Sequence, residues 1–357
     1  SYARCAERCK RAGLDGVEIH GAHAHEVAQF MSRIYNTRTD EYGGTPENRA
    51  RFPGEIIRAI KARCGPDFPV IFRISGLEKV EGGRGIEETA ALSKLFEAAG
   101  ADAIHVSCGM PESEPYISAP MDVDDCFNAE NAAVVKRAVS VPVITCNRVV
   151  DVAEAEQILE SGLADMTSMG RALLADPELI HKYEGSNPDP VRRCLGCNQG
   201  CRDVALYRKI CCLQNPRLGR ESELNFTEVP PERRSLKIMI AGAGPAGLEA
   251  AVDLALRGFS PVVYEKGPAP GGLAVLAALP PHKRNMNSVI DYRIAMLKRY
   301  GVPVHCGVEV DLQRLEEEKP DVLIAATGSA PLFPKIPGID GPGVYSADEV
   351  IAGKEIP

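Results

Sequence analysis

Residues 70–76 read Val70-Ile71-Phe72-Arg73-Ile74-Ser75-Gly76, an apolar, β-rich run that ends in a polar cluster containing glycine. Similar runs recur along the N-terminal half, and the stretches between them have the apolar spacing of amphipathic helices. This alternation predicts a parallel α/β sheet with helical crossovers, either doubly wound or closed as a (β/α)₈ barrel. The other expected strands are Gly16–His20, Ala103–Ser107, Val141–Cys146 and Ala164–Met169, and the expected helices are Arg51–Cys64, Glu87–Ala99, Ala129–Ala138 and Val152–Ser161.

The carboxyl ends of the expected strands favour the barrel. Each strand is followed by a polar or glycine-containing cluster, and the active site of a (β/α)₈ barrel is assembled from the loops at these ends. Two clusters also suit a phosphate group, because glycine lets backbone N–H groups approach and arginine supplies positive charge. These two are Cys146-Asn147-Arg148 and Met169-Gly170-Arg171, and the others are His20-Gly21-Ala22-His23, Arg73-Ile74-Ser75-Gly76 and Ser107-Cys108-Gly109.

Several segments resemble the old yellow enzyme family, and above all its multidomain flavin and iron–sulfur branch, typified by 2,4-dienoyl-CoA reductase, enoate reductase and trimethylamine dehydrogenase. The resemblance implies that the segment around His20 is the fourth strand of an FMN-binding TIM barrel. Residues 1–190 would then be an incomplete barrel with about strands four to eight, and upstream sequence would be missing. The matching segments are His20–His23, Gln29-Phe30, Asn36–Gly44, Glu47–Phe52, Phe72–Ser75, Asn147-Arg148, Met169–Arg171 and Ala175–Pro177.

The same resemblance implies a set of FMN contacts. Arg73 would lie near the pyrimidine edge of the flavin and stabilise negative charge on the reduced ring. Arg148, with the backbone around Gly170 and Arg171, would hold the FMN phosphate. The cofactor-binding residues implied in the barrel are Arg73, Asn147, Arg148, Met169, Gly170 and Arg171.

Three histidines after the first expected strand receive catalytic roles by resemblance. His20 and His23 would donate hydrogen bonds to a substrate carbonyl or to the flavin, which makes the β-carbon of the substrate electrophilic enough to accept hydride. His25 stands where the family usually has a tyrosine that protonates the α-carbon, and histidine can also donate a proton near neutral pH. His25 is therefore either the acid or a spectator.

Two further observations bear on this histidine group. Pro111 stands where dienoyl-CoA reductases have a histidine, so the substrate pocket is expected to differ from the dienoyl-CoA type. The three histidines could alternatively bind a metal, but no nearby acidic residue completes a recognisable zinc motif.

Five of the twelve cysteines lie between Cys194 and Cys212. In a chain that is not a small secreted domain, such a cluster indicates metal ligation in a reducing compartment rather than disulfides. Three close cysteines and one remote cysteine suit a [4Fe–4S] centre, whereas structural zinc more often takes two separated Cys-x-x-Cys pairs. The family pattern implies Cys194, Cys197, Cys201 and Cys212 as ligands and Cys211 as a neighbour that does not bind.

The segment after Leu236 predicts the start of a nucleotide-binding domain. A strand at Leu236–Ala241 precedes Gly242-Ala243-Gly244-Pro245-Ala246-Gly247, and the helix Leu248–Arg257 follows. This is the dinucleotide fingerprint in its usual context, and Glu265 at the end of the next strand, Pro261–Tyr264, would accept a hydrogen bond from a ribose hydroxyl. The predicted dinucleotide contacts here are Gly242, Gly244, Ala246, Gly247 and Glu265.

Two later motifs extend this prediction by resemblance. Gly271-Gly272-Leu273 and Ala325-Ala326-Thr327-Gly328 are similar to the FAD-binding halves of disulfide-reductase-like flavoproteins, which adds Gly272, Thr327 and Gly328 to the cofactor contacts. The family passes hydride from NAD(P)H to FAD and electrons onward through the cluster to FMN. An NAD(P)H subdomain would begin after Pro357, and ADP in place of FAD stays open.

The expected organisation is an incomplete barrel over 1–190, an iron–sulfur segment over 191–219, a linker over 220–235 and a partial Rossmann-like FAD/NAD(P)-binding domain over 236–357. A net charge of −8 gives no reason to expect nucleic acid or an anionic membrane as partner, and no apolar run of about 18 residues exists. The chain is expected to be cytoplasmic, and it could form a homo-oligomer.

The first functional hypothesis is an NAD(P)H-dependent ene-reductase that reduces the activated C=C bond of a small α,β-unsaturated carbonyl compound. The second is an amine dehydrogenase or demethylase of the trimethylamine dehydrogenase type. An aromatic bowl for a methylammonium would support it, and the absence of tryptophan counts mildly against it. The third is that the chain by itself is an inactive fragment with unpaired strand edges.

Overall fold

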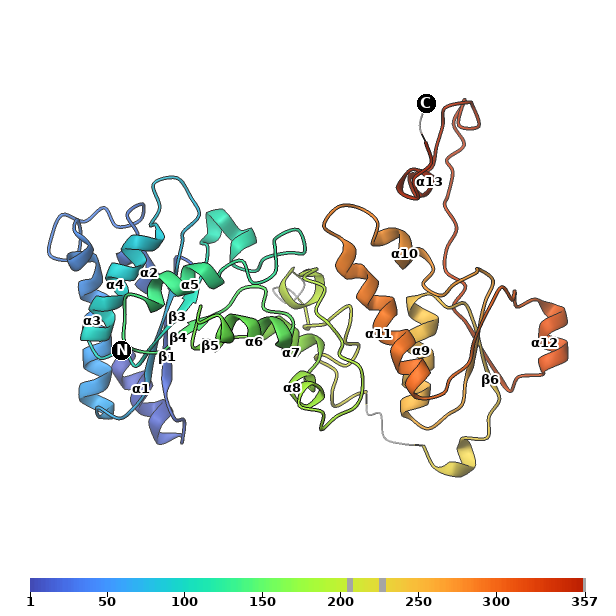
Figure 1. Cartoon of the computed structure of the whole chain (residues 1–357), viewed down its shortest axis with the longest axis horizontal. Helices are drawn as coiled ribbons and strands as arrows, with labels where there is room; N and C mark the ends of the chain where they lie inside the picture. Colours follow the sequence, from blue (N-terminus) through green and yellow to red (C-terminus); the bar gives the residue numbers. More distant parts are fainter. Residues whose placement is uncertain (204–207, 225–228, 356–357) are drawn as a thin grey trace. The chain divides into compact units, whose positions relative to one another are not determined.

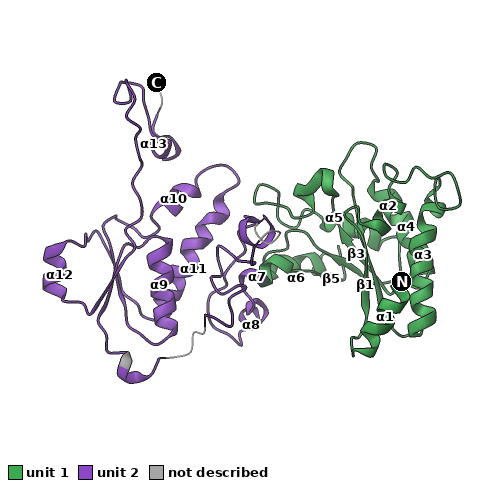
Figure 2. Cartoon of the chain, turned by 180° about the vertical axis from the view of Figure 1, so that it is seen from behind, with its two compact units in different colours: residues 1–173 green, residues 174–357 purple. Residues whose placement is uncertain are grey.

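The structure is a computed structural model that describes residues 1–203, 208–224 and 229–355 (Figure 1). The chain divides into two compact units, Ser1–Leu173 and Leu174–Pro357, coloured separately in Figure 2. The second unit begins before the cysteine segment because the residues that follow Leu173 bond to that segment. Asn215 Nδ2 donates to the Leu174 carbonyl at 3.0 Å, and the Arg192 amide donates to Asp176 at 2.7 Å.

The first unit contains a five-stranded sheet whose strands are all parallel and lie in sequential order, β1-β2-β3-β4-β5. A doubly wound sheet reverses its strand order at a switch point, whereas neighbouring strands of a (β/α)₈ barrel follow one another along the chain. The sequential order therefore agrees with the barrel alternative. The strands are β1 (Val17–Gly21), β2 (Val70–Ser75), β3 (Ala103–Ser107), β4 (Val143–Thr145) and β5 (Met166–Thr167), close to the five expected runs.

Helices connect these strands as the sequence predicts. The longest, α3 (Pro46–Cys64), begins five residues before the expected start, because Thr45 caps it: the Thr45 hydroxyl accepts a hydrogen bond from the Asn48 amide at 3.3 Å. Pro46 at the first helical position favours the same start. The other helices of the unit are α1 (Tyr2–Arg11), α2 (Glu26–Met31), α4 (Ile86–Ala98), η1 (Pro111–Tyr116), α5 (Ala129–Lys136), α6 (Val152–Glu160) and α7 (Gly170–Ala175).

Strand β2 shows how the sheet separates its core from its functional face. Successive side chains of a strand point to opposite faces, and Phe72 and Ile74 are fully buried, whereas Ile71 and Arg73 are only half-buried. The Phe72 ring packs on Phe96 of α4 with ring centroids 4.1 Å apart. One face of β2 therefore packs against helices, and the opposite face presents Arg73.

The second unit holds a four-stranded parallel sheet in the order β8-β7-β6-β9. Numbered from its own first strand, this order is 3-2-1-4, the arrangement of a mononucleotide-binding Rossmann half. Its strands are β6 (Ile238–Ala241), β7 (Val262–Glu265), β8 (Val304–Cys306) and β9 (Val322–Ala325), and its helices are α8 (Leu179–Tyr183), η2 (Gln199–Asp203), η3 (Pro231–Arg233), α9 (Pro245–Leu256), α10 (Leu273–Ala277), η4 (Arg284–Asn287), α11 (Ser288–Arg299), α12 (Leu312–Glu318) and α13 (Ala347–Ile351).

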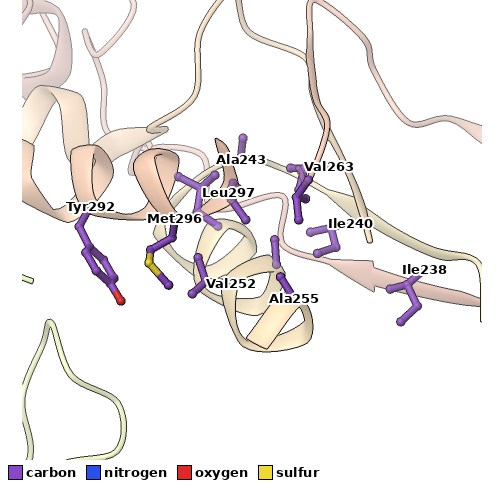
Figure 3. Packing of buried hydrophobic residues seen from close by; sticks show 12 residues of the cluster. Ile238, Ile240, Ala243, Val252, Ala255, Val263, Tyr292, Met296 and Leu297 are labelled. Carbon is purple, nitrogen blue, oxygen red and sulfur yellow. The ribbon is translucent and has the colours of Figure 1, made fainter. Parts of the chain in front are cut away.

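A hydrophobic core joins the sheet of the second unit to helices α9 and α11. Figure 3 shows Val252 of α9, Leu297 of α11 and Ile240 of β6 among the side chains of this core, and all three are at most 1% exposed. The predicted linker over 220–235 includes residues 225–228, which lie outside the described residues. Across the described ranges, no helix is both long and apolar enough to cross a membrane.

Truncation of Phe72 tests the core of the first unit. Phe72→Ala removes a fully buried ring from between β2 and α4, and we expect it to lower the free energy of unfolding of this unit by about 3–5 kcal/mol, measured by chemical denaturation. The matched control is Leu14→Ala, whose side chain is 56% exposed, with an expected change within about 0.5 kcal/mol. Equal effects of the two substitutions would contradict the assigned core.

Candidate functional site

The three predicted histidines lie together at the carboxyl end of β1. The ring centroid of His20 is 5.1 Å from that of His23 and 4.5 Å from that of His25. His20 Nδ1 accepts a hydrogen bond from the Ala22 amide at 3.3 Å, so the ring proton of neutral His20 lies on Nε2. His23 has a left-handed backbone (φ 58°), and its Nε2 lies 2.8 Å from the Ser107 hydroxyl.

Burial keeps two of these imidazoles neutral. It lowers the pKa of His23 to about 3, and the positive charge of Arg73 adds to this effect. Burial, His25 and Arg73 lower the pKa of His20 to about 4, although His20 is exposed, so that water weakens the effect there. Neutral imidazoles keep one ring N–H each, and His20 and His23 can therefore donate a hydrogen bond throughout the neutral pH range.

Arg73 occupies the middle of the functional face. In the sheet it pairs with His20 of β1 on one side and with His105 of β3 on the other. Its Nη2 lies 3.4 Å from the Ser107 hydroxyl, and its Nη1 lies 4.0 Å from Glu18. Its Nε is buried and has no hydrogen-bond partner among the described residues. A half-buried guanidinium whose buried Nε donor is unused suits a polar ligand at this face.

Asn147 and Arg148 form an unusual turn after β4. Both have left-handed backbones, with φ angles of 78° and 58°, which L side chains adopt at a cost of about 1–3 kcal/mol each. Contacts with the preceding loop compensate this cost. Asn147 Nδ2 donates to the Tyr116 and Ile117 carbonyls at 3.1 and 3.2 Å, and Arg148 pairs with Asp125.

The side chains of Arg148 and Arg171 both hold the same loop in this structure. Arg148 Nη1 donates to the Pro120 carbonyl at 3.0 Å, and Arg171 Nη1 donates to the Ala119 carbonyl at 2.8 Å. Gly170 begins α7, and the preceding Met169 is 9% exposed. The five strand ends are thus neighbours in one sheet, but the two guanidinium groups assigned to a phosphate bond to loop carbonyls.

The cysteine segment holds its sulfur atoms among backbone N–H groups. Cys194 Sγ accepts from the Gly196 amide and Cys212 Sγ from the Gln214 amide, both at 3.4 Å. Burial raises the pKa of the Cys197 thiol, and the charges of Cys194 and Cys212 act in the same direction, which indicates that these thiols are neighbours. Within the described ranges, no three His, Cys, Asp or Glu side chains are arranged to hold a single metal ion.

The absence of a side chain at Gly200 lets the backbone around Cys211 approach the turn that carries Cys201. A Cβ at Gly200 would lie 2.3 Å from the Cys211 carbonyl oxygen, and the Cys211 amide donates to the Gly200 carbonyl at 3.3 Å. This contact puts Cys212 next to the turn that carries Cys201. Cys211 itself is exposed, whereas the four predicted ligands are half-buried.

The glycine fingerprint of the second unit has the expected geometry. A Cβ at Gly247 would lie 2.0 Å from the Gly242 carbonyl oxygen, so the third glycine permits tight packing of α9. Among the described residues other than its chain neighbours, no atom lies within 4 Å of a Cβ placed on Gly244, which leaves the space that a pyrophosphate would need. Glu265, at the end of β7, accepts a hydrogen bond from the Ala243 amide at 2.8 Å.

The remaining predicted contacts lie around this loop. A Cβ on Gly272 would be 3.3 Å from the Gly244 Cα, and a Cβ on Gly242 would be 3.3 Å from the Thr327 Cα. Gly328 follows with a left-handed backbone (φ 74°), and Ala246 lies in the first turn of α9. The loop after β6, the loop before α10 and the end of β9 therefore meet at one site.

Sequence reasoning missed two polar residues in the interior of β1 and β3, Glu18 and His105. Glu18 Oε2 lies 2.7 Å from His105 Nδ1. Ser107, from the predicted cluster at the end of β3, contacts both His23 and Arg73. The alternation of apolar and polar side chains in Ala103–Ser107 could have revealed His105. This alternation puts His105 and Ser107 on one face of the strand, while Ile104 and Val106 face the core.

Comparisons with known proteins agree with this geometry. A model of the NADH:flavin oxidoreductase / NADH oxidase family matches residues 1–189, and a model of an NAD(P)-binding Rossmann-like domain matches residues 240–300. The chain is 38% identical to an NADH oxidase of Thermoanaerobacter brockii, over 99% of this chain and 54% of the relative. It is 36% identical to a cinnamate reductase of Clostridium sporogenes, over 98% of this chain and 54% of that relative.

A solved structure extends the likeness to the whole chain. The 2-naphthoyl-CoA reductase in complex with 2-naphthoyl-CoA superimposes with a TM-score of 0.93 at 32% identity, covering 99% of this chain and 54% of that one. The fold and site define a flavin- and NAD(P)-binding oxidoreductase. The chain belongs to the NADH:flavin oxidoreductase / NADH oxidase family, and it spans about half the length of the curated relatives it matches.

Two glycine substitutions in the fingerprint distinguish an effect on dinucleotide binding from an effect on folding. Gly244→Val adds a side chain in open space, at a backbone conformation (φ −75°) that valine tolerates, so we expect an unchanged melting temperature but loss of dinucleotide binding. Gly247→Val, the matched control, drives a side chain into the Gly242 carbonyl and should lower the melting temperature. Calorimetric titration with FAD, NADH and ADP measures binding, and retained binding in Gly244→Val would refute the assignment.

Proposed function

We propose that this chain is part of an ene-reductase that reduces the activated C=C bond of an α,β-unsaturated carbonyl compound. The observation that carries the proposal is the group of His20, His23 and Arg73 at the end of β1 and β2, with the two imidazoles neutral and the guanidinium partly unpaired. FMN, when bound, would supply the hydride. The cinnamate reductase and naphthoyl-CoA reductase relatives support this substrate class.

The histidines would act on the substrate carbonyl. The Nε2–H group of His20 is available to the substrate because His20 Nδ1 accepts a hydrogen bond from the Ala22 amide. The neighbouring His23 adds a second imidazole, with 5.1 Å between the two ring centroids. Two neutral donors withdraw electron density from the carbonyl oxygen and stabilise the negative charge that develops there. His25 lies beside His20 and would deliver the proton to the α-carbon.

The strand ends fit a bound FMN. Arg73 Nε and Thr145 Oγ1 are buried polar atoms without a hydrogen-bond partner among the described residues, and Arg73 would face the ring. Because the guanidinium groups of Arg148 and Arg171 bond to loop carbonyls, the backbone around Asn147 and Gly170, with Met169, would carry most of the phosphate contacts. This differs from the side-chain contact that the resemblance implies for Arg148.

The cysteine segment fits a [4Fe–4S] cluster, and zinc is the alternative that the test must exclude. Its N–H···S hydrogen bonds to Cys194 and Cys212 are the contacts by which proteins stabilise cluster sulfur. FAD in the fingerprint of the second unit, with NAD(P)H as the electron donor, would complete the electron path to this cluster.

The proposed organisation keeps the barrel over 1–190, the cluster segment over 191–219 and the nucleotide-binding domain over 236–357. The proposed partner is a small unsaturated carbonyl compound, and the proposed location is the cytoplasm.

Reoxidation of the reduced flavin tests the reaction. Anaerobic, FMN-loaded protein reduced with dithionite should be reoxidised by cinnamate or by an aryl-CoA ester. His25→Phe should slow this step by about 10²–10⁴, the usual value of general acid catalysis, and His25→Tyr should keep substantial activity. Reduction of oxidised flavin by dimethylamine or sarcosine, without C=C reduction, would favour the amine dehydrogenase, and failure of both would favour the inactive fragment.

Metal analysis tests the cluster. Anaerobically purified protein should contain about four iron and four acid-labile sulfide per chain. Cys212→Ser should abolish the cluster, whereas Cys211→Ser, which changes the exposed neighbour, should preserve it. Stoichiometric zinc without iron, or equal loss in the two variants, would contradict the ligand set.

A further inference from the structure

Both ends of the cysteine segment reach the same carboxylate, that of Glu249 on α9. Before the first cysteine, Arg192 Nη2 lies 3.5 Å from Glu249 Oε1. After the last cysteine, Arg293 of α11 connects the two parts: its Nε lies 2.6 Å from Glu249 Oε2, and its Nη1 donates to Gln214 Oε1 at 3.0 Å. Arg192 and Gln214 each stand two positions from a predicted metal ligand.

The contacts to Glu249 are ion pairs that lack hydrogen-bond geometry, so charge is what joins these side chains. Solvent reaches them only slightly, because the side chains of Arg192, Arg293 and Glu249 are 11%, 4% and 16% exposed. Charges in such surroundings are weakly screened by salt and interact more strongly than charges at the surface. One carboxylate therefore holds two guanidinium groups that belong to different parts of the chain.

Gln214 carries this restraint to a sulfur atom. Its side chain is 1% exposed, and its Nε2 donates to the Arg193 carbonyl and to the Ser288 hydroxyl, both at 3.2 Å. Its own amide donates to Cys212 Sγ at 3.4 Å. The residue that donates to this sulfur is thus fixed by α11 and by the opposite end of the segment.

Arg192 is fixed in a similar way at the other end. Its Nη1 donates to Asn215 Oδ1 at 3.3 Å, and its Nη2 donates to the Tyr292 hydroxyl at 3.0 Å. Its guanidinium carbon lies 4.6 Å from the centroid of the Tyr292 ring, a cation–π contact. Glu249 itself lies in the first half of α9, the helix that begins directly after Gly244 of the fingerprint. The ends of the cysteine segment are therefore attached to the helix that follows the dinucleotide loop.

We propose that Glu249 is a positioning residue that, through Arg192 and Arg293, fixes both ends of the cysteine segment on α9 and sets the charge next to the metal group there. The inference rests on the proposed function only for the identity of that group, a [4Fe–4S] cluster. A cluster becomes more negative when it is reduced, so loss of a nearby negative charge raises its reduction potential and loss of a positive charge lowers it.

Two substitutions change this charge in opposite directions. Glu249→Gln removes a negative charge while it keeps the shape of the side chain, and it should shift the reduction potential of the cluster to a more positive value. Arg293→Met removes a positive charge and should shift the potential to a more negative value. The double variant loses one charge of each sign, so its potential should return close to that of the unmodified chain. Structural damage would not reverse its sign with the charge removed, nor cancel in the double variant.

The potentials are measured by redox titration of the full chain with electron paramagnetic resonance, at about pH 8.5. Burial and the charge of Glu249 raise the pKa of Asp253, one turn further along α9, to about 7. Near neutral pH, ionisation of Asp253 would therefore offset the loss of Glu249, whereas Asp253 is already ionised at the higher pH. The matched control is Glu317→Gln, whose carboxylate is 50% exposed and pairs with Arg314 of the same helix, and it should leave the potential unchanged.

Hydrogen exchange tests the attachment of the segment whether or not a cluster is present. Glu249→Gln should speed amide exchange in peptides from both 191–203 and 208–216, and Glu317→Gln should change neither. The double variant should give the same result and replaces Glu249→Gln if that variant does not fold. Faster exchange at one end only, or at neither, would overturn the proposal, and so would potential shifts of equal sign, or none, in the two single variants. Absence of iron from the unmodified chain would instead count against the proposed function, and hydrogen exchange alone would then decide the role of Glu249.

Discussion

The parallel pairing of β1, β2 and β3 is the constraint on which the functional face depends. It fixes His20 beside Arg73 and Arg73 beside His105, so three basic side chains from distant parts of the chain occupy one row. Parallel strands end at the same edge of a sheet, and the loops after them therefore meet there. A slip of one residue in β2 would move Arg73 to the helix side and Phe72 to the functional face, losing both the core and the site.

Different neighbours on this face explain why two buried histidines, His23 and His105, differ in charge. His23 has Arg73 as its main charged neighbour, and burial with this cation keeps its imidazole neutral. Burial acts to lower the pKa of His105, but Cys146 and the Glu18 carboxylate, whose Oε2 lies 2.7 Å from His105 Nδ1, together raise it to about 9. While Glu18 is ionised, the stabilising contact is therefore complete below about pH 6.5 and is lost as the pH rises through about 9, and protonation of Glu18 in acid removes it as well. One face thus holds neutral donors next to a charged pair.

Much of this architecture was predictable from the sequence, because apolar runs and their polar ends are local signals. The five strands of the first unit and the first two strands of the second were predicted from such runs, and the predicted histidines and fingerprint glycines follow the strands that were expected to precede them. The strand order of the second unit was not predicted, because it depends on pairing between distant segments. The contact between Glu18 and His105 was not predictable, since it joins residues 87 positions apart and depends on strand pairing. The ion pair between Arg148 and Asp125 was also not predictable, because Asp125 lies in an irregular loop.

The turn at Asn147 and Arg148 shows how such a loop can determine a site. Two consecutive left-handed residues with side chains cost roughly 1–3 kcal/mol each, and glycine would adopt these angles freely. The turn keeps this conformation because Asn147 bonds to the Tyr116 and Ile117 carbonyls and Arg148 pairs with Asp125. The loop after β3 thus holds the end of β4 in place. The backbone at this turn is preorganised by side chains, so any phosphate bound there would meet main-chain groups whose direction is already fixed.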